Sequence, residues 1–290
     1  MQFIVYILAY PFLWIISILP FRILYWISDG LYFLVYYVIG YRKKVVRDNL
    51  QLTLPHLSTK ERLDIEKKSY LHFCDLFLEM AKTMTISSEE INKRFVITNL
   101  DLLKEYELKE KSIMLFVSHY ASWEWLVAVN KKISFRGFAV YKRVNNKYFD
   151  QLVKKIRSRF NTTLVVNNET IPLIANNQRN KVFSMYGIPS DQSPTLNRIV
   201  HKERFMGIDV PVHIGGETLA KKYDLNVLYA KVSKVKRGYY ECTLIPLSDD
   251  VKSVPNFEIT NTYLREVEKQ INAAPEYYFW THRRWKHRLK

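Results

Sequence analysis

The sequence predicts an α/β fold, in which helices flank a central, largely parallel sheet, with a helical, membrane-attached region at the amino terminus. Three observations lead to this prediction. The first forty or so residues are almost uncharged, short apolar runs alternate with helical patterns after residue 96, and 290 residues with 48% hydrophobic content can bury a sizeable core. We therefore expect a membrane-anchoring segment over 1–41, a helical region over 42–95 and an α/β domain over 96–290.

The amino-terminal segment carries no charge over residues 3–21. A helix of that length reaches about 28 Å, close to the thickness of a bilayer's hydrocarbon core. We expect Pro11 to kink this helix and Pro20 to end it. Residues 23–41 form a second apolar stretch, interrupted only by Asp29 and Gly30.

A basic cluster follows, and it is typical of a cytoplasmic flank beside anionic headgroups; it contains Arg42, Lys43, Lys44 and Arg47. A cleaved signal peptide is disfavoured, because neither a positive n-region nor a small-residue cleavage site is present. A buried pair of core helices is the remaining alternative. Whether the first segment spans the bilayer, or both segments lie as a hairpin in one leaflet, stays open.

In the helical region, Ser58 and Glu61 have the spacing of a capping box. A long amphipathic helix is expected from there to about residue 84, with core positions at Leu63, Tyr70, Phe73, Cys74, Phe77, Met80 and Ala81. Strands are predicted over 113–118, 138–141, 163–166, 182–186, 227–232 and 240–244. Helices are predicted over 122–130, 147–160, 170–177, 216–223 and 260–273.

Composition limits the partners and the chemistry. The 44 Lys and Arg exceed the 28 Asp and Glu, so the net charge of +16 predicts an anionic partner such as a membrane surface, an acidic protein or nucleic acid. No helix-turn-helix, zinc-finger or RNA-binding pattern supports nucleic acid. The two cysteines, Cys74 and Cys242, are far apart and are expected to be free thiols. There is no P-loop, dinucleotide-binding motif or metal-ligand cluster, so neither a cofactor nor a metal is expected.

The most informative segment is SHYASWE at residues 118–124, after an apolar strand and before a helical pattern. Functional sites of open α/β sheets lie beyond the carboxyl ends of strands. On one ideal helix His119 and Glu124 would be about 140° apart, so they can meet only if His119 lies on the turn before the helix, with Ser122 as N-cap. Glu124 would then orient the imidazole, whose other nitrogen could take a proton from a hydroxyl.

No serine nucleophile in a GxSxG setting accompanies this pair, so direct attack by an activated substrate hydroxyl is favoured over an acyl-enzyme. An isolated His-x4-Glu pattern is more often a capped helix beside an incidental histidine. Further motifs along the chain decide in favour of a functional pair.

HYASWE resembles the HX4E motif of the lipid A late acyltransferases, the lauroyl and myristoyl transferases, within the glycerolphosphate-acyltransferase-like group. The resemblance covers nearly the whole chain. Its other motifs are GYRKKVVRDNL at 40–50, Tyr141-Lys142 with Asn145-Asn146, the basic run 156–159, DQSP at 191–194, and PEYYFWTHRRWK at 275–286. Two departures are Tyr141-Lys142-Arg143, where many members have Tyr-Arg-Pro, and Tyr229, where members often have proline.

The resemblance implies a glycerolphosphate-acyltransferase-like sheet and transfer of a fatty acyl group from an acyl carrier protein thioester to a hydroxyl of a lipid A precursor. It implies His119 as general base, Glu124 as its orienting carboxylate and Arg157 as the residue that neutralises charge at the reacting centre. Candidate substrate-binding residues are Asp150, Arg159, Asp191 and Gln192. Asp150 and Arg157 lie seven residues apart, nearly in line on one helix face, so we expect them to share a site.

The expected location is the bacterial inner membrane, with the catalytic domain facing the cytoplasm. Two alternatives remain: an acyltransferase for another lipid acceptor, such as a lysophospholipid, a glycolipid or an aminolipid, and a non-catalytic basic membrane protein. The sequence contains no feature that identifies the acceptor.

Overall fold

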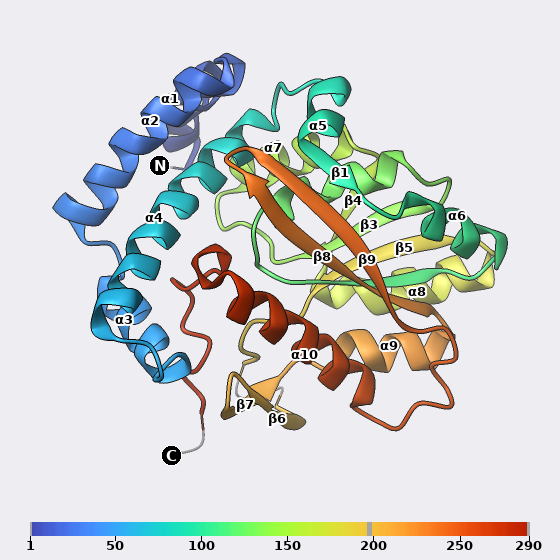
Figure 1. Ribbon diagram of the computed structural model, residues 1–290. Coiled ribbons are helices and arrows are strands. Elements are labelled where there is room, and N and C mark those ends of the chain that lie inside the picture. The colour runs from blue at the N-terminus through green and yellow to red at the C-terminus, as the bar shows by residue number, and fades with distance from the viewer. Residues whose placement is uncertain (1, 196–198, 289–290) are drawn as a thin grey trace.

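The computed structural model describes residues 2–195 and 199–288, and within them seven strands form one sheet in the order β1-β9-β8-β2-β5-β3-β4 (Figure 1). Every neighbouring pair is parallel except β8 and β9, which form an antiparallel hairpin. The predicted α/β fold with a largely parallel sheet is therefore confirmed. The strands are β1 (Phe95–Ile97), β2 (Ile113–Val117), β3 (Arg136–Tyr141), β4 (Thr162–Val166), β5 (Ser184–Pro189), β8 (Asn226–Lys236) and β9 (Tyr239–Ser248).

The helices of the α/β part follow the predicted ranges closely, except that the sequence predicted no helix over residues 100–108. They are α6 (Leu100–Leu108), α7 (Lys147–Ser158), α8 (Thr170–Arg179), α9 (Gly215–Tyr223) and α10 (Glu258–Ala273), with short 3-10 helices η3 (Asn167–Glu169) and η5 (Pro275–Tyr277). One difference is that residues 122–130 form a 3-10 helix, η2 (Trp123–Lys131), rather than an α-helix.

Three strands were not predicted. β1 has only three residues, and β6 (His201–Phe205) and β7 (Ile208–Val212) form a separate antiparallel hairpin. In β6 charged and partly exposed residues outnumber apolar ones, so an apolar pattern could not reveal it.

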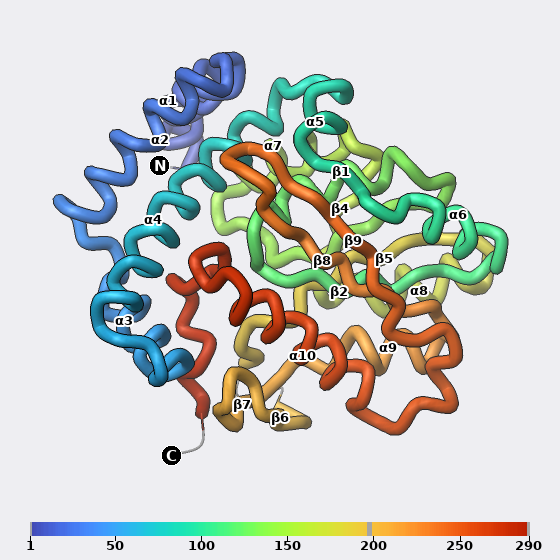
Figure 2. The backbone as a smooth tube through the Cα atoms, viewed as in Figure 1, coloured from blue at the N-terminus to red at the C-terminus, as the bar shows by residue number. Residues whose placement is uncertain are grey.

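The amino-terminal helices form a layer along one side of the molecule, and α4 separates α1 and α2 from the sheet (Figures 1 and 2). The elements are α1 (Gln2–Ile18), α2 (Phe21–Phe33), the π-helix η1 (Leu34–Ile39), α3 (Lys43–Thr53), α4 (Thr59–Lys82) and α5 (Ser88–Arg94). As predicted, the first helix ends before Pro20.

The outer surface of this layer is apolar. Phe12 in α1 is 69% exposed and Trp26 in α2 is 73% exposed, so a buried pair of core helices does not describe the structure. Among the described residues no single helix has the length and hydropathy of a membrane span. The pair Phe21–Ile39 and Lys43–Thr53 meets both criteria together but is bent by 91° between its two parts.

Helix α4 begins with the predicted capping box, in which Ser58 and Glu61 each bind the other's backbone N–H. Its buried face differs from the prediction. Leu63, Phe77 and Met80 are exposed, whereas the carboxylates of Glu66, Asp75 and Glu79 are buried. These carboxylates have hydrogen-bond partners, which is why the helix can bury them: Tyr36 and Arg47 for Glu66, Ser28 and Arg237 for Asp75, and Tyr25 and Tyr240 for Glu79. Tyr70, Cys74 and Ala81 are buried as expected, and Cys74 and Cys242 are both free thiols.

Candidate active site

The candidate active site lies where β2 and β5 end side by side. The two strands are parallel, with Val117 opposite Pro189, so the segments that follow them leave the sheet at the same edge. His119 follows β2 and Asp191 follows β5. Strand pairing, rather than proximity in the sequence, brings these two side chains together.

Asp191 holds His119 at two points. Its Oδ1 is 2.7 Å from Nδ1 of the imidazole, and its Oδ2 accepts a hydrogen bond of 3.1 Å from the backbone N–H of His119. Asp191 is fully buried, whereas the His119 side chain is 21% exposed. With Nδ1–H donating to Asp191, the neutral imidazole presents an unprotonated Nε2. No hydrogen bond from another described residue occupies Nε2.

His119 and Glu124 do not form the hydrogen bond that the sequence predicted. Asp191, rather than Glu124, binds Nδ1 of His119. Glu124 instead accepts a hydrogen bond of 2.7 Å from Nη2 of Arg157, and both side chains are less than one-fifth exposed. The 3-10 geometry of η2 changes the angle between successive side chains relative to an α-helix. Ser122 is the N-cap residue as predicted, but its hydroxyl makes no capping hydrogen bond.

His119 and Asp191 form a dyad whose pKa values are shifted by burial and by their mutual attraction. Burial by itself lowers the pKa of His119, but the attraction and hydrogen bond of Asp191, with a smaller attraction from Glu124, outweigh it, so the pKa lies above its ordinary value. For Asp191, burial raises the pKa, and His119 together with backbone N–H groups lowers it below the ordinary value. The dyad therefore holds its negative charge on Asp191.

The other predicted residues have different surroundings. Asp150 is buried at the start of α7 and accepts hydrogen bonds from Tyr141, the backbone of Val144 and Lys154. Arg157, about 10 Å further along the helix, binds Glu124. Asp150 and Arg157 thus have different partners among the described residues, and a shared site for the two stays a prediction.

Arg159 binds the chain at the end of α4. Its guanidinium donates to the carbonyls of Thr83, Met84 and Ile86, just beyond the carboxyl end of α4, where a cation is favourable. Gln192 lies half-buried next to Asp191. The structure thus gives Asp150 and Arg159 contacts that stabilise the fold. The expected substrate-binding role of Asp150, Arg159 and Gln192 stays a prediction.

The carboxyl-terminal segment 275–286 covers the turn at residues 119–121. The backbone N–H of Phe279 donates to the carbonyl of His119, and the N–H of Ala121 donates to the carbonyl of Tyr277. Ala121 has a left-handed φ of 49°, and this pairing compensates for that conformation. The Phe279 ring also lies 6.2 Å from the imidazole, so this segment forms one wall of the site.

Two polar groups of this segment were not singled out from the sequence. Arg284 is fully buried, and its Nη1 donates to the carbonyl of Pro211. Within the described residues its Nε and Nη2 have no partner, and neither has Nε2 of His282. Burial lowers the pKa of His282 to about 4, so it is neutral near pH 7. The HRRW sequence pointed to this segment, but only the structure shows that its second arginine is buried.

The match to a family model over residues 1–287 defines the class of protein as an acyltransferase. The chain belongs to the bacterial lipid A biosynthesis acyltransferases. It is 24% identical over 280 residues to the lipid A biosynthesis lauroyltransferase of Escherichia coli K12, covering 95% of this chain and 89% of that protein. It is 22% identical over 278 residues to the palmitoleoyltransferase of the same organism and, to the same extent, to a lipid A biosynthesis acyltransferase of Shigella flexneri, with the same coverage of each chain.

Proposed function

We propose that this acyltransferase moves a fatty acyl group from an acyl carrier protein thioester to a hydroxyl of a lipid A precursor, with His119 as the general base and Asp191 as the carboxylate that orients it. The observation that carries the proposal is the Asp191 contact with Nδ1, which leaves Nε2 of His119 to receive a proton. This assignment revises the expected role of Glu124.

In the proposed step, Nε2 takes the proton of the acceptor hydroxyl as its oxygen attacks the thioester carbonyl. The new C–O bond forms, and the carbonyl oxygen becomes an oxyanion. When the C–S bond breaks, the carbonyl is restored, and the leaving thiolate takes the proton back from the imidazolium. Asp191 stabilises the imidazolium between these events, so no covalent acyl-enzyme is needed.

The Glu124–Arg157 pair has a separate role in this proposal. Arg157 keeps four of its five N–H groups for other acceptors when Nη2 binds Glu124. A guanidinium held by a carboxylate is a fixed donor, and it can stabilise negative charge that develops on the thioester oxygen. Glu124 thus positions Arg157, and its charge also favours the imidazolium form of His119.

An aromatic path leads from the dyad to the exposed surface of α4, and we assign it to the acyl chain. The His119 ring is 5.3 Å from that of Trp123, which is 5.3 Å from that of Phe279. Phe279 stacks on Phe73 at 5.9 Å, and Phe73 lies 4.7 Å from the exposed Phe77. A long apolar substituent gains contact area along such a path.

The surface of α1 and α2 and the charge of the chain support a location for the enzyme. The exposed apolar residues of α1 and α2 support attachment to a membrane, and the net charge of +16 attracts both an acidic carrier protein and a phosphorylated lipid. We propose the inner membrane, with the α/β part on the cytoplasmic side. Digestion of the α/β part by protease in inverted vesicles, and its protection in intact spheroplasts, is the expected result.

The deciding experiment compares wild type with His119→Ala and Asp191→Asn in purified form. Each enzyme receives an acyl carrier protein thioester and a lipid A precursor, and the acylated product is followed by mass spectrometry. Loss of turnover in both variants, with melting temperatures close to wild type, is expected. Normal turnover by His119→Ala would overturn the mechanism, and transfer only to another lipid would overturn the acceptor.

A further inference from the structure

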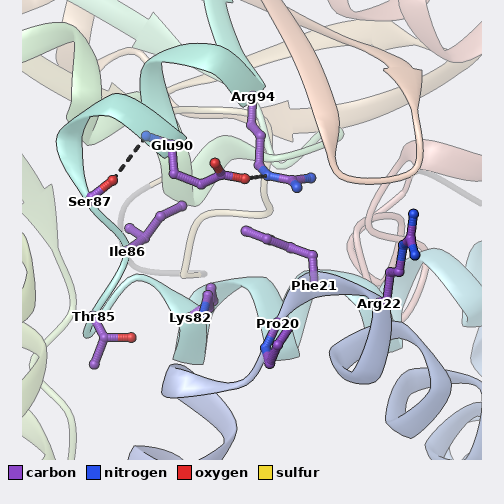
Figure 3. Close-up of a pocket in the computed structure, with 9 residues that line it drawn as sticks. All are labelled: Pro20, Phe21, Arg22, Lys82, Thr85, Ile86, Ser87, Glu90 and Arg94. Carbon is purple, nitrogen blue, oxygen red and sulfur yellow. Dashed lines mark hydrogen bonds and ion pairs between the residues drawn. The ribbon is translucent and has the colours of Figure 1, made fainter.

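A second concave site lies at the corner between α1 and α2, away from the dyad. It is an open cavity of about 450 Å³ between this corner, the end of α4 and α5 (Figure 3). That volume falls within the range of small-molecule sites. Its lining residues are Pro20, Phe21, Arg22, Lys82, Thr85, Ile86, Ser87, Glu90 and Arg94, and none of the four residues His119, Asp191, Glu124 and Arg157 belongs to the lining.

The lining is cationic. It contains three cations, Arg22, Lys82 and Arg94, and a single carboxylate, Glu90. Glu90 is occupied by Arg94, whose Nε donates to it at 2.5 Å. Among the described residues neither Arg22 nor Lys82 has a carboxylate within salt-bridge distance, so the cavity keeps an unneutralised positive charge.

Two of these cations are held in place before any ligand arrives. The Arg94 guanidinium lies 3.5 Å from the centre of the Phe21 ring, and its Nη1 donates to the carbonyl of Gly238. Lys82 is 9% exposed, and one of its three N–H groups donates to the carbonyl of Leu19 at 2.6 Å. Since the fold has already removed these cations from most of their water, an entering anion gains attraction without having to desolvate them.

An apolar surface begins where the cationic lining ends. Pro20 and Phe21 belong to the lining itself. On either side of this corner Ile18 of α1 and Ile23 of α2 are exposed, and they continue into the apolar surface of both helices. A ligand with an anionic head and apolar tails matches both the cationic lining and the apolar surface beside it. A free anion would contact the cationic lining alone.

We infer that this cavity binds the phosphate headgroup of an anionic membrane lipid, with the tails lying along α1 and α2. Arg22, on α2 in Figure 3, and Lys82, on α4, are the two lining cations that have no carboxylate partner among the described residues and can meet the phosphate. A zwitterionic headgroup fits poorly, because its own cation would approach Arg94 and Lys82. The bound lipid would fix the α1–α2 corner at the level of the headgroups.

The test is native mass spectrometry of the full-length protein in neutral detergent with phosphatidylglycerol or phosphatidylcholine, without acyl donor or acceptor. We expect one phosphatidylglycerol per chain, and binding of phosphatidylcholine that is weaker by about five-fold or more. Arg22→Gln and Lys82→Met should each weaken phosphatidylglycerol binding about five-fold. Arg22 is exposed, so its variant keeps the fold even where Lys82→Met does not.

The matched control is Lys236→Gln, which removes an exposed cation on the nearby β8–β9 hairpin but outside the cavity. It should bind phosphatidylglycerol as wild type does. Equal loss in Lys236→Gln and Arg22→Gln would overturn the inference in favour of diffuse surface charge, and equal binding of both lipids would overturn it as well. Displacement of the lipid by an equal concentration of inorganic phosphate would show a free-anion site instead. Because no turnover is measured, these outcomes are independent of the proposed reaction.

Discussion

A single carboxylate, that of Asp191, binds both the ring and the backbone N–H of His119, so it fixes the tautomer of the imidazole. A carboxylate at Nδ1 makes the imidazole a stronger base at Nε2. Asp191 is therefore a positioning residue with a measurable effect on the proton equilibrium of the site.

We predict that Asp191→Asn lowers kcat/KM by about 10²–10⁴-fold. Because the pKa of His119 is raised mainly by this carboxylate, and the base must be neutral to act, wild-type activity should rise with pH above the ordinary imidazole range. In Asp191→Asn the rise should move to lower pH. A pH profile of kcat/KM checks this, and an unchanged midpoint would contradict the role given to Asp191.

Glu124 and Arg157 form a second hydrogen-bonded pair, and we expect their substitutions to have non-additive effects. Arg157→Met is expected to lower kcat by about 10²–10³-fold if it stabilises the oxyanion, with little change in KM. Glu124→Gln should cause a smaller loss, and the double variant should lose far less than the product of the two. Steady-state kinetics of the three variants test this. Fully additive losses would show that the two residues act independently.

At the level of elements, two distant motifs hold each other. Asn49 in α3 donates from Nδ2 to the carbonyls of Trp280 and His282, and Arg42 donates to the carbonyl of Thr281. The carboxyl-terminal segment in turn pairs with the backbone of His119 and Ala121. The GYRKKVVRDNL motif thus supports the active site indirectly, through the segment that covers it.

We predict that Asn49→Ala destabilises the protein by about 1–3 kcal/mol, because the buried carbonyl of Trp280 loses the donor that Asn49 supplies, whereas the carbonyl of His282 keeps the N–H of Arg284. Turnover should fall with it, because the wall of the site loosens. Thr53→Val is the matched control, since Thr53 is buried on the same helix and its hydroxyl, within the described part of the chain, bonds the carbonyl of Asn49 alone. Melting curves and turnover are measured together, and equal effects of the two substitutions would contradict this account.

The buried polar face of α4 predicts a pH-dependent stability. Burial is the main cause that raises the pKa of Glu79 from 4.5 to about 7, and repulsion by Asp75 adds to it, against attraction by Lys234 and hydrogen bonds from two tyrosines. A raised carboxyl pKa means that the folded state holds its proton more tightly than the unfolded state. Stability should therefore fall by about 3 kcal/mol as the pH rises from 4.5 to 7 and then level off.

Melting temperatures of wild type and Glu79→Gln between pH 4 and 8 measure this contribution. The amide does not titrate, so the fall in stability over that range should be smaller in the variant. Parallel curves for the two proteins would assign the pH dependence to other groups.

On the scale of the whole molecule, we propose that the apolar layer of α1 and α2 attaches the enzyme to the membrane. Phe12 and Trp26 are among its most exposed residues, and burying a large apolar side chain is worth about 1.5–3 kcal/mol. Phe12→Asp with Trp26→Asp should release the protein from vesicles in a flotation assay without altering its circular dichroism. Leu108→Asp is the control, because Leu108 is 84% exposed on α6, outside this layer. Equal flotation of the double variant would contradict membrane attachment through these helices.

We also expect that the reaction needs neither a metal nor a nucleotide. Cleavage of a thioester is favourable by itself, and the proposed step moves its proton through His119 alone. Full activity in excess EDTA is the expected result. A loss that zinc or magnesium restores would show that the reaction depends on a metal.

The sequence by itself determined the alternating elements, the apolar amino terminus and the importance of residues 118–124, because these depend on local periodicity and on short motifs. It also placed His119 and Asp191 correctly at the ends of strands. Only the tertiary structure decided that Asp191, rather than Glu124, contacts His119, because the register of β2 with β5 joins residues 72 positions apart. The same holds for Arg284 and for Glu79, whose burial is set by partners on other elements. Local patterns fix which helices and strands form, whereas the partners of buried charges depend on how those elements pack.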